Sequence, residues 1–256
     1  MSSFDSFDSA VRAFWTGRDL QAQRQVESGN LDAGTRGAVT GGKHLRPLED
    51  AVAEQFAPLV ERGAEVLRGA RLTLPGHYRR SKDWDLLVTF KGALVAAVEF
   101  KSQVGSIGNN FNNRTEEALG NAVDIWKAYE EGTFGPVRPW LGFVFVIEHS
   151  DVSSRVSRRD PITLFPADPI FHGTSYIDRY RILAQRLVRE RLYDATCVLT
   201  TCPGEGILEE PVQEVSVANF TAAVAGRIAY IEALNRLFPI EGVGPDFAVV
   251  GASVRG

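Results

Sequence analysis

"DWDLLVTFKGALVAAVEFKSQVG", residues 83–105, decides the fold of this chain. It contains two apolar runs, DLLVTF and ALVAAVEFK, joined by KG, and a two-residue connection that ends in glycine predicts a tight antiparallel hairpin. Three charged residues interrupt the apolar pattern: Asp85 begins the first run, and Glu99 and Lys101 lie near the end of the second. Buried strands seldom carry charge, so these residues call for a chemical explanation.

Pairing through this turn brings the three charges together. Glu99 and Lys101 project from one face of their strand because side chains alternate, and the antiparallel partner places Asp85 beside them. Two buried carboxylates raise each other's pKa unless a cation neutralises them, and one lysine compensates half of their charge. Carboxylate oxygens with a backbone carbonyl and waters suit Mg²⁺. We expect Mg²⁺ on Asp85 and Glu99, with Lys101 orienting or deprotonating the attacking water or stabilising charge on a phosphate.

The spacing of Asp85, thirteen residues and then Glu-Phe-Lys resembles the pattern of the PD-(D/E)xK nucleases. Trp84 stands where the name of the pattern has proline, a position that varies widely in these enzymes. The alternative is a surface hairpin that carries a salt bridge, since exposed ion pairs are common. The order of the predicted elements, a helix, three strands, a helix and a buried strand, favours the nuclease.

The remaining periodicity predicts an α/β fold. The uninterrupted apolar run at 140–149 indicates a strand covered on both faces, in a central parallel position. We expect one nuclease domain, 1–256, with a restriction-endonuclease-like core (helix, three-strand meander, helix, strand), a mixed central sheet flanked by helices, and added N- and C-terminal helices. Helices are predicted at 6–27, 46–67, 115–131, 175–191 and 217–237, and further strands at 70–75 and 196–201.

Composition sets limits on the class of protein. The chain has 256 residues, of which 44% are hydrophobic and 23% charged, and a net charge of -4 that argues against nonspecific binding of polyanions. The N-terminus lacks the features of a signal peptide and no run approaches a membrane span, so we expect a cytoplasmic protein. Cys197 and Cys202 form no metal-binding spacing and are expected to be ordinary core thiols.

Three longer stretches resemble the XhoI family of type II restriction endonucleases. They are LDAGTRGAVTGGKHL (31–45), LPGHYRRSKDWDLLV (74–88) and VAAVEFKSQVGSIGNNFNNRTEEALGNAVDIWKAYEEG (95–132). The resemblance implies a Mg²⁺-dependent homodimer that cuts the palindrome CTCGAG after the first C, leaves 5′ overhangs and works beside a cognate DNA methyltransferase. It also implies catalytic roles for Asp85, Glu99 and Lys101.

Several polar residues outside the hairpin are candidates for binding. The segment 108–114 is expected to be a loop whose Asn and Arg side chains read base edges, although Asn113 also suits a helix cap. Glu49 lies at the edge of an apolar helical stripe and is expected to support the metal if its helix packs on the hairpin; a solvated glutamate is the alternative. The DNA-binding candidates are Asn109, Asn110, Asn112, Asn113, Arg114, Arg36, Lys43 and Arg155.

Three other functions are alternatives to a restriction endonuclease. A structure-specific resolvase or repair nuclease would use the same chemistry. A DNA-binding regulator that has lost activity would lack Asp85, Glu99 or Lys101, and all three are present. A hydrolase that acts on sugars through paired carboxylates would need neither the lysine nor a metal.

Overall fold

A computed structural model describes residues 2–27, 43–156, 163–238 and 240. The strands in these ranges form one six-stranded sheet in the order β1-β2-β3-β4-β5-β6. The pairs from β1 to β3 are antiparallel, β3-β4 and β4-β5 are parallel, and β6 is antiparallel to β5. The strands are β1 (Ala64–Pro75), β2 (Ser81–Phe90), β3 (Ala93–Gln103), β4 (Trp140–Glu148), β5 (Ala195–Thr201) and β6 (Ile207–Glu209).

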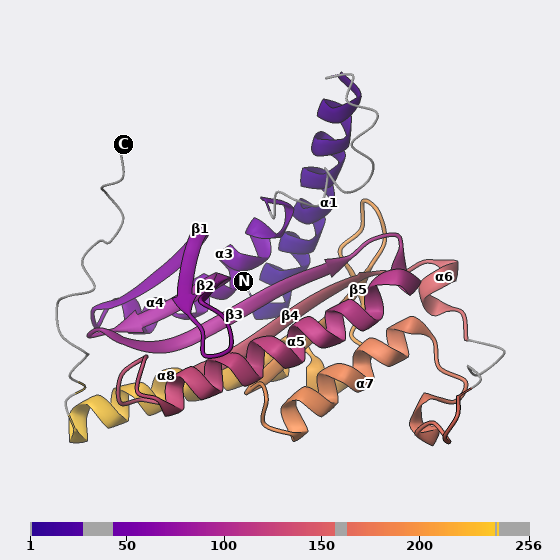
Figure 1. The fold of residues 1–256 in the computed structure, drawn as a ribbon. Helices are drawn as coiled ribbons and strands as arrows, with labels where there is room; N and C mark the ends of the chain where they lie inside the picture. The colour runs from indigo at the N-terminus through magenta and orange to yellow at the C-terminus, as the bar shows by residue number, and fades with distance from the viewer. Residues whose placement is uncertain (1, 28–42, 157–162, 239, 241–256) are drawn as a thin grey trace, which may run out of the picture.

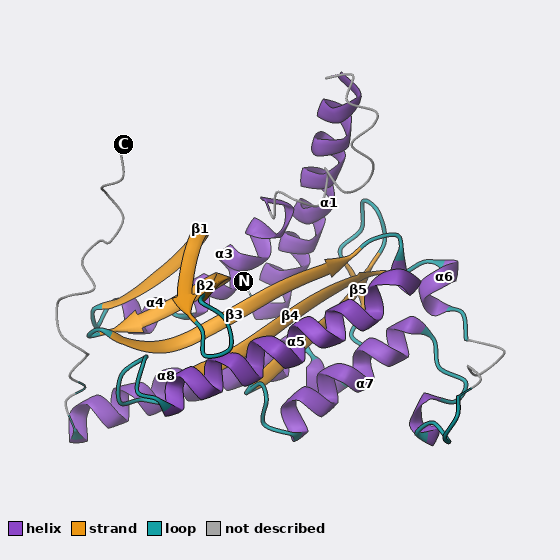
Figure 2. Cartoon of the chain, viewed as in Figure 1, coloured by secondary structure: helices purple, strands orange, loops and turns teal. Residues whose placement is uncertain are grey.

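Helices cover both faces of the sheet. In the described ranges they are α1 (Ser3–Glu27), α3 (Arg46–Gln55), α4 (Ala57–Val60), α5 (Ile107–Glu130), α6 (Asp151–Ser154), α7 (Tyr176–Arg189) and α8 (Val217–Leu237), with 3₁₀ turns at Lys43–Leu45, Pro169–Phe171 and Gln213–Val215. Helices α5 and α7 pack on one face and α1, α3 and α8 on the other (Figures 1 and 2). The α/β class and the predicted mixed sheet are confirmed.

None of the helices that the structure describes has the length and apolarity needed to cross a membrane.

The predicted hairpin is present. Strands β2 and β3 are antiparallel, and the turn between them consists of Lys91 (φ 50°) and Gly92 (φ 78°). Two successive positive φ angles are typical of the hairpin turn whose twist matches that of the strands. The pairing begins at the turn and runs to Leu86 opposite Val98.

Strand β4 occupies the central parallel position that its apolar run predicts. It lies between β3 and β5 and is parallel to both. Phe143 and Phe145 face the α5 and α7 layer, while Val144 and Val146 face the α1, α3 and α8 layer. Burial on both faces explains why the run shows no polar alternation.

The single helix expected over 46–67 is wrong. Helix α3 ends at Gln55, the short helix α4 follows, and β1 already begins at Ala64. Pro58 stands in the first turn of α4, where proline is tolerated, whereas it would break a continuous helix. Gly63 has a φ of 96°, so the chain turns there into the edge strand.

The segment 108–114 is not a loop. Helix α5 begins at Ile107, so the four asparagines lie in its first two turns and Asn113 is no cap. Gly105 (φ 64°) and Ser106 (φ 44°) turn the chain sharply from β3 into the helix. Ile107 is buried and Phe111 packs edge-on to Tyr180 of α7, which holds the polar first turns against the protein.

Candidate active site

Strands β2 and β3 separate where the charged residues stand. The last paired residues are Leu86 and Val98, and Asp85 is the next residue on β2. Its Oδ2 accepts a hydrogen bond of 2.8 Å from the backbone N–H of Phe100. A side-chain carboxylate therefore takes the place of a backbone acceptor, which satisfies a buried donor and fixes the carboxylate at the mouth of the hairpin.

Strand β1 is irregular beside the same point. Its register with β2 passes from Arg68 opposite Leu86 to Leu72 opposite Trp84, so β1 bulges opposite Asp85. A bulge interrupts the ladder and redirects nearby side chains, and such features are common next to active sites. The backbone around Asp85 thus departs from regular strand pairing on both sides.

Glu99 lies at the centre of the charged cluster. Its side chain is 3% exposed, and its two oxygens contact two lysines. Lys101, from the same strand, forms an ion pair with Oε1. Lys82, from β2, lies 2.6 Å from Oε2. The prediction that Glu99 and Lys101 share a face of β3 is confirmed by their contact.

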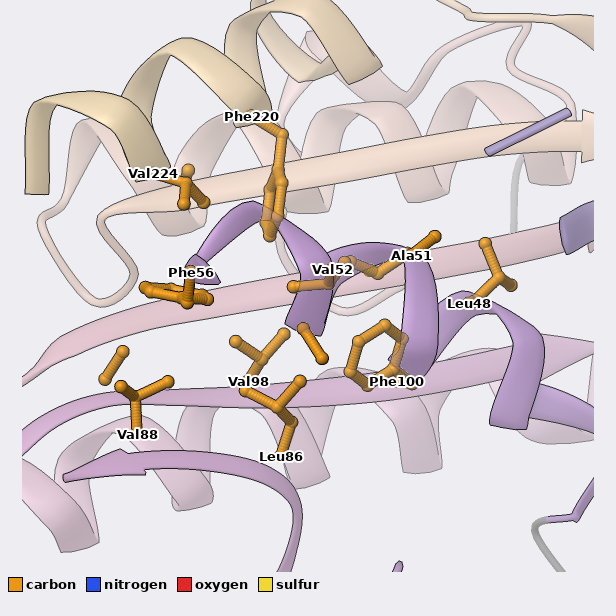
Figure 3. Packing of buried hydrophobic residues seen from close by; sticks show 14 of the residues in the cluster. Leu48, Ala51, Val52, Phe56, Leu86, Val88, Val98, Phe100, Phe220 and Val224 are labelled. Atoms are coloured by element: carbon orange, nitrogen blue, oxygen red, sulfur yellow. The ribbon is translucent and has the colours of Figure 1, made fainter. Parts of the chain in front are cut away.

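Helix α3 packs on the hairpin and carries Glu49 to it. Leu48 and Val52 of the helix are buried with Leu86 and Phe100 of the hairpin (Figure 3). Glu49 itself is 7% exposed, whereas Glu54, farther along the helix, is exposed. The solvated alternative for Glu49 is therefore excluded.

Burial and the negative charge of neighbouring carboxylates raise the pKa values of Asp85 and Glu49. Burial, followed by the charge of Glu99, raises the pKa of Asp85 to about 6. Burial, followed by the charge of Asp85, raises the pKa of Glu49 to about 7. Burial also acts to raise the pKa of Glu99, but the ammonium groups of Lys101 and Lys82 bring it below its ordinary value. Arg46 Nη1 lies 3.7 Å from Glu49 Oε2, and Lys101 acts on Asp85, but in both carboxylates these cations do not offset burial and the neighbouring negative charge.

The donors suit a hard divalent cation that keeps part of its hydration. Among the described residues, no three His, Cys, Asp or Glu side chains converge closely enough to form a complete metal cage. Mg²⁺ does not require one, because it is usually held by one or two carboxylates, with waters and substrate phosphate completing its shell. Asp85 keeps Oδ1 for a ligand while Oδ2 binds Phe100. The carboxylates of Asp85 and Glu49 are thus of the kind that holds Mg²⁺, whereas Glu99 would have to release one of its two lysines to serve as a ligand.

The DNA-binding candidates are placed unequally. Asn112 and Asn113 are exposed and Asn110 is half-buried on the first turns of α5, three residues after β3. Arg114 is half-buried and donates a hydrogen bond of 2.6 Å to Glu117 of its own helix. Arg155 is exposed directly after α6. Arg36 and the side chains of Lys43 and Asn109 lie outside the described residues.

A second polar cluster, centred on Asp124 of α5, was not predicted. Asp124 is 4% exposed and accepts hydrogen bonds from the backbone N–H groups of His77 and Tyr78 and from Nε of Arg79. Arg79 also donates to Asn121. The β1–β2 loop is therefore tied to α5, although 45 residues separate Arg79 from Asp124.

Lys82 also belongs to the charged cluster, although the sequence pattern does not single it out. Regular alternation would place Lys82 and Asp85 on opposite faces of β2. The bulge beside β2 breaks that alternation, and the lysine reaches Glu99. Arg79, Arg80 and Lys82 form a basic group before Asp85, which is the available signal in the sequence, but such a group also suits a solvated surface.

Comparison of the sequence with known proteins identifies its family. The family described as "Restriction endonuclease XhoI" matches residues 24–207. The type II restriction enzyme BstVI of Geobacillus stearothermophilus is 36% identical over 218 residues, which make up 81% of this chain and 97% of that protein. The type II restriction enzyme XhoI of Xanthomonas vasicola is 41% identical over 70% of this chain and 72% of its own length. The type II restriction enzyme AbrI of Azospirillum brasilense is 44% identical over 57% of this chain and 67% of its own length.

No solved structure is a significant match to the chain. The family match covers more than half of the chain and includes the whole hairpin with its charged residues. The chain therefore belongs to the XhoI family of type II restriction endonucleases, which are deoxyribonucleases.

Proposed function

We propose that this restriction enzyme cleaves both strands of DNA in a Mg²⁺-dependent reaction, with Asp85, Glu99 and Lys101 as its catalytic residues. One observation carries the proposal: the half-buried carboxylate of Asp85, the buried carboxylate of Glu99 and the ammonium of Lys101 converge where β2 and β3 separate, and Glu49 approaches from α3. Asp85 and Glu99 hold the metal, and Glu49 supports it. The whole chain, 1–256, acts as one nuclease domain with helical additions.

The roles of these side chains follow from their charges. When bound, Mg²⁺ supplies a Lewis acid at the scissile phosphate and lowers the pKa of a coordinated water. Burial acts to lower the pKa of Lys101, but the charges of Glu99 and Asp85 raise it above its ordinary value. In the metal-free protein the ammonium group is thus the favoured form. Lys101 orients the attacking water or stabilises negative charge on phosphorus oxygens, and removal of a proton from the water is the alternative role.

Attack of water in line with the leaving 3′ oxygen breaks the P–O3′ bond. The products carry a 5′-phosphate and a 3′-hydroxyl. The family resemblance supports CTCGAG as the recognition sequence, cut after the first C to leave a 5′ overhang. A palindrome suits a homodimer, because a twofold axis in the protein matches the twofold axis of the site and brings one active site to each strand.

The cellular setting follows from site-specific double-strand cleavage. An enzyme that cuts a short palindrome also threatens the DNA of its own cell. We propose that it acts in the cytoplasm and is paired with a methyltransferase that protects the same sequence.

Digestion of a sequenced plasmid tests the proposal. The purified chain is incubated with the plasmid in Mg²⁺ or in EDTA, and the cut ends are sequenced. Discrete fragments in Mg²⁺ alone, with every end at C^TCGAG, support the reaction and the site. Discrete ends at another sequence overturn the recognition site while retaining the nuclease, and cleavage in EDTA overturns the metal requirement.

A further inference from the structure

Lys82 is an enclosed lysine with a defined set of contacts. Its Nζ lies 2.6 Å from Glu99 Oε2 and donates a hydrogen bond of 2.8 Å to the backbone carbonyl of Asp83. The same ammonium group lies 4.3 Å from the centre of the Trp84 ring, within range of a cation–π contact. Its side chain is 12% exposed, compared with 23% for Lys101. These contacts distinguish Lys82 from a solvated surface lysine.

Two ammonium groups occupy Glu99. Lys101 contacts Oε1 and Lys82 contacts Oε2, so each oxygen already faces a cation. A divalent ion that coordinates Glu99 needs one of these oxygens and is repelled by the ammonium beside it. Binding therefore requires that one lysine move away from the carboxylate.

Lys82 lies nearer the edge of the sheet than Lys101. Although its side chain is the less exposed of the two, Lys82 is the second residue of β2, follows the exposed Ser81 and pairs with Leu74 of the edge strand β1, whereas Lys101 lies within β3 and pairs with Phe145 of the central strand β4. An ammonium group displaced from Glu99 is stabilised by another anion. The DNA phosphate next to the metal is such an anion. The Trp84 ring remains as a surface for its alkyl chain and ammonium group.

We propose that Lys82 is a positioning residue that neutralises and holds Glu99 in the metal-free enzyme, competes with the divalent metal for that carboxylate, and passes to a DNA phosphate when the metal binds. This inference rests on the proposed role of Glu99 as a metal ligand. Its consequence is that metal binding is weak until DNA is present to accept the lysine. Lys82 thereby couples the assembly of the metal site to substrate binding.

Calcium binding without DNA tests the competition. Ca²⁺ is titrated calorimetrically into wild-type protein, Lys82→Met and Lys127→Met, the last a control that loses an exposed lysine of α5. We expect Lys82→Met to bind Ca²⁺ at least about fivefold more tightly, the lower end of the coupling between two ligands of one protein. Lys127→Met is expected to match the wild type. Equal or weaker binding by Lys82→Met without DNA overturns the proposal. With a noncleavable duplex, where Lys82 contacts phosphate, the advantage of Lys82→Met is expected to disappear, and an undiminished advantage overturns the transfer to phosphate.

Two further variants distinguish a failure of the Lys82 proposal from a failure of the proposed metal role of Glu99. Glu99→Gln is expected to abolish Ca²⁺ binding. If Glu99→Gln binds Ca²⁺ with the affinity of the wild type, Glu99 is not a metal ligand, and the proposed function is contradicted together with the role of Lys82. Lys82→Arg keeps the charge and is expected to bind Ca²⁺ no more tightly than the wild type. A gain in Lys82→Arg equal to that in Lys82→Met would attribute the effect to shape and overturn the competition.

Thermal unfolding provides a readout independent of metal titration. In EDTA, Lys82→Met is expected to have a lower Tm than the wild type because buried Glu99 loses one of its two cations, and saturating Ca²⁺ is expected to restore it. In Ca²⁺, Lys82→Met should also show a salt slope of DNA binding that is shallower by about one phosphate contact. An unchanged slope would overturn the transfer of Lys82 to phosphate.

Discussion

The backbone N–H of Phe100 donates its hydrogen bond to the carboxylate of Asp85 and not to a carbonyl of β2. This contact lets a charged residue stand at the end of an otherwise apolar hairpin. It also provides a clean test of function, because asparagine keeps an acceptor oxygen for Phe100 but loses the negative charge. Alanine at position 85 would remove both the acceptor for Phe100 and the negative charge, so a loss of cleavage could then come from a loss of stability.

Cleavage should depend on all three residues of the nuclease pattern. Asp85→Asn, Glu99→Gln and Lys101→Met are each expected to lower the rate of plasmid cleavage by at least about 10³-fold, since each removes charge from the reacting centre. Circular dichroism and Tm establish that each variant is folded. Lys127→Ala, which loses an exposed ion pair on α5, serves as the control. Any folded variant that cuts like the wild type would remove that residue from the catalytic set.

The contribution of Asp85 and Glu49 to the stability of the metal-free protein should fall as the pH rises from about 4 to about 7, while buried His44, whose pKa is lowered to about 4, acts in the opposite direction in all variants. The pKa of Asp85 is raised to about 6 by burial and the charge of Glu99, and that of Glu49 to about 7 by burial and the charge of Asp85. Unfolded carboxyls ionise near about 4, so within this window the folded protein retains protons that the unfolded chain releases. A raised carboxyl pKa therefore costs stability above the window.

This pH dependence is measured by thermal unfolding in EDTA at pH 5 and pH 8. The drop in Tm should be smaller for Asp85→Asn, which removes one of the two groups and the charge that acts on Glu49. Magnesium at pH 8 should raise the Tm of the wild type more than that of the variant. The same drop in both proteins would contradict the shared burial of these carboxylates.

Base reading should map to the start of α5. The N-terminal turns of a helix can enter the major groove, and an asparagine lost from a bidentate contact to adenine costs about 1–3 kcal/mol on the cognate sequence alone. We expect Asn112→Ala to weaken binding to CTCGAG far more than to a scrambled duplex, measured in Ca²⁺ to prevent cleavage. Asn110→Ala, at a half-buried position, is the companion variant.

Arg155→Ala provides the contrast for these variants. Arg155 is exposed beyond β4 and is expected to contact phosphate, so its loss should weaken cognate and scrambled binding equally and flatten the salt dependence. If every asparagine variant loses equal affinity for both duplexes, α5 does not read bases. The search would then move to the segment 34–44 or to the region after residue 150.

The Asp124 cluster should matter for stability and for the β1–β2 loop. Asp124→Ala leaves the N–H groups of His77 and Tyr78 and the side chain of Arg79 without their acceptor. We expect a loss of about 3 kcal/mol in the free energy of unfolding by urea. Glu130→Ala on the same helix removes only an exposed pair and should cost less than about 1 kcal/mol. Similar losses in the two variants would contradict a structural role for Asp124.

Local patterns predicted the parts of this fold that local forces determine. The Lys91–Gly92 turn, the buried run of β4 and helix α8 follow from turn chemistry and periodicity, and the structure confirms them. Helix α5 was predicted to begin too late, because a polar sequence rich in asparagine favours loops in isolation. Its actual start depends on Ile107 and Phe111 packing against the protein, which no local pattern reveals.

The candidate active site also has parts that local sequence predicts and parts that depend on tertiary structure. The proximity of Glu99 and Lys101 follows from strand alternation within one segment. The contact of Lys82 with Glu99 depends on an irregular register between β1 and β2, and the burial of Glu49 depends on how α3 packs across the hairpin. Tertiary features of this kind are set by the whole core rather than by neighbouring residues.

The two-residue turn at Lys91–Gly92 has a consequence for how such an enzyme changes over generations. It keeps Lys82, Asp85, Glu99 and Lys101 within one short, contiguous segment of the chain. A contiguous segment is inherited as a unit by recombination, and contacts between residues close in sequence, such as those of a hairpin, cost little loop-closure entropy in folding. New recognition sequences can therefore arise by replacing the surrounding elements while the hydrolytic unit passes on intact.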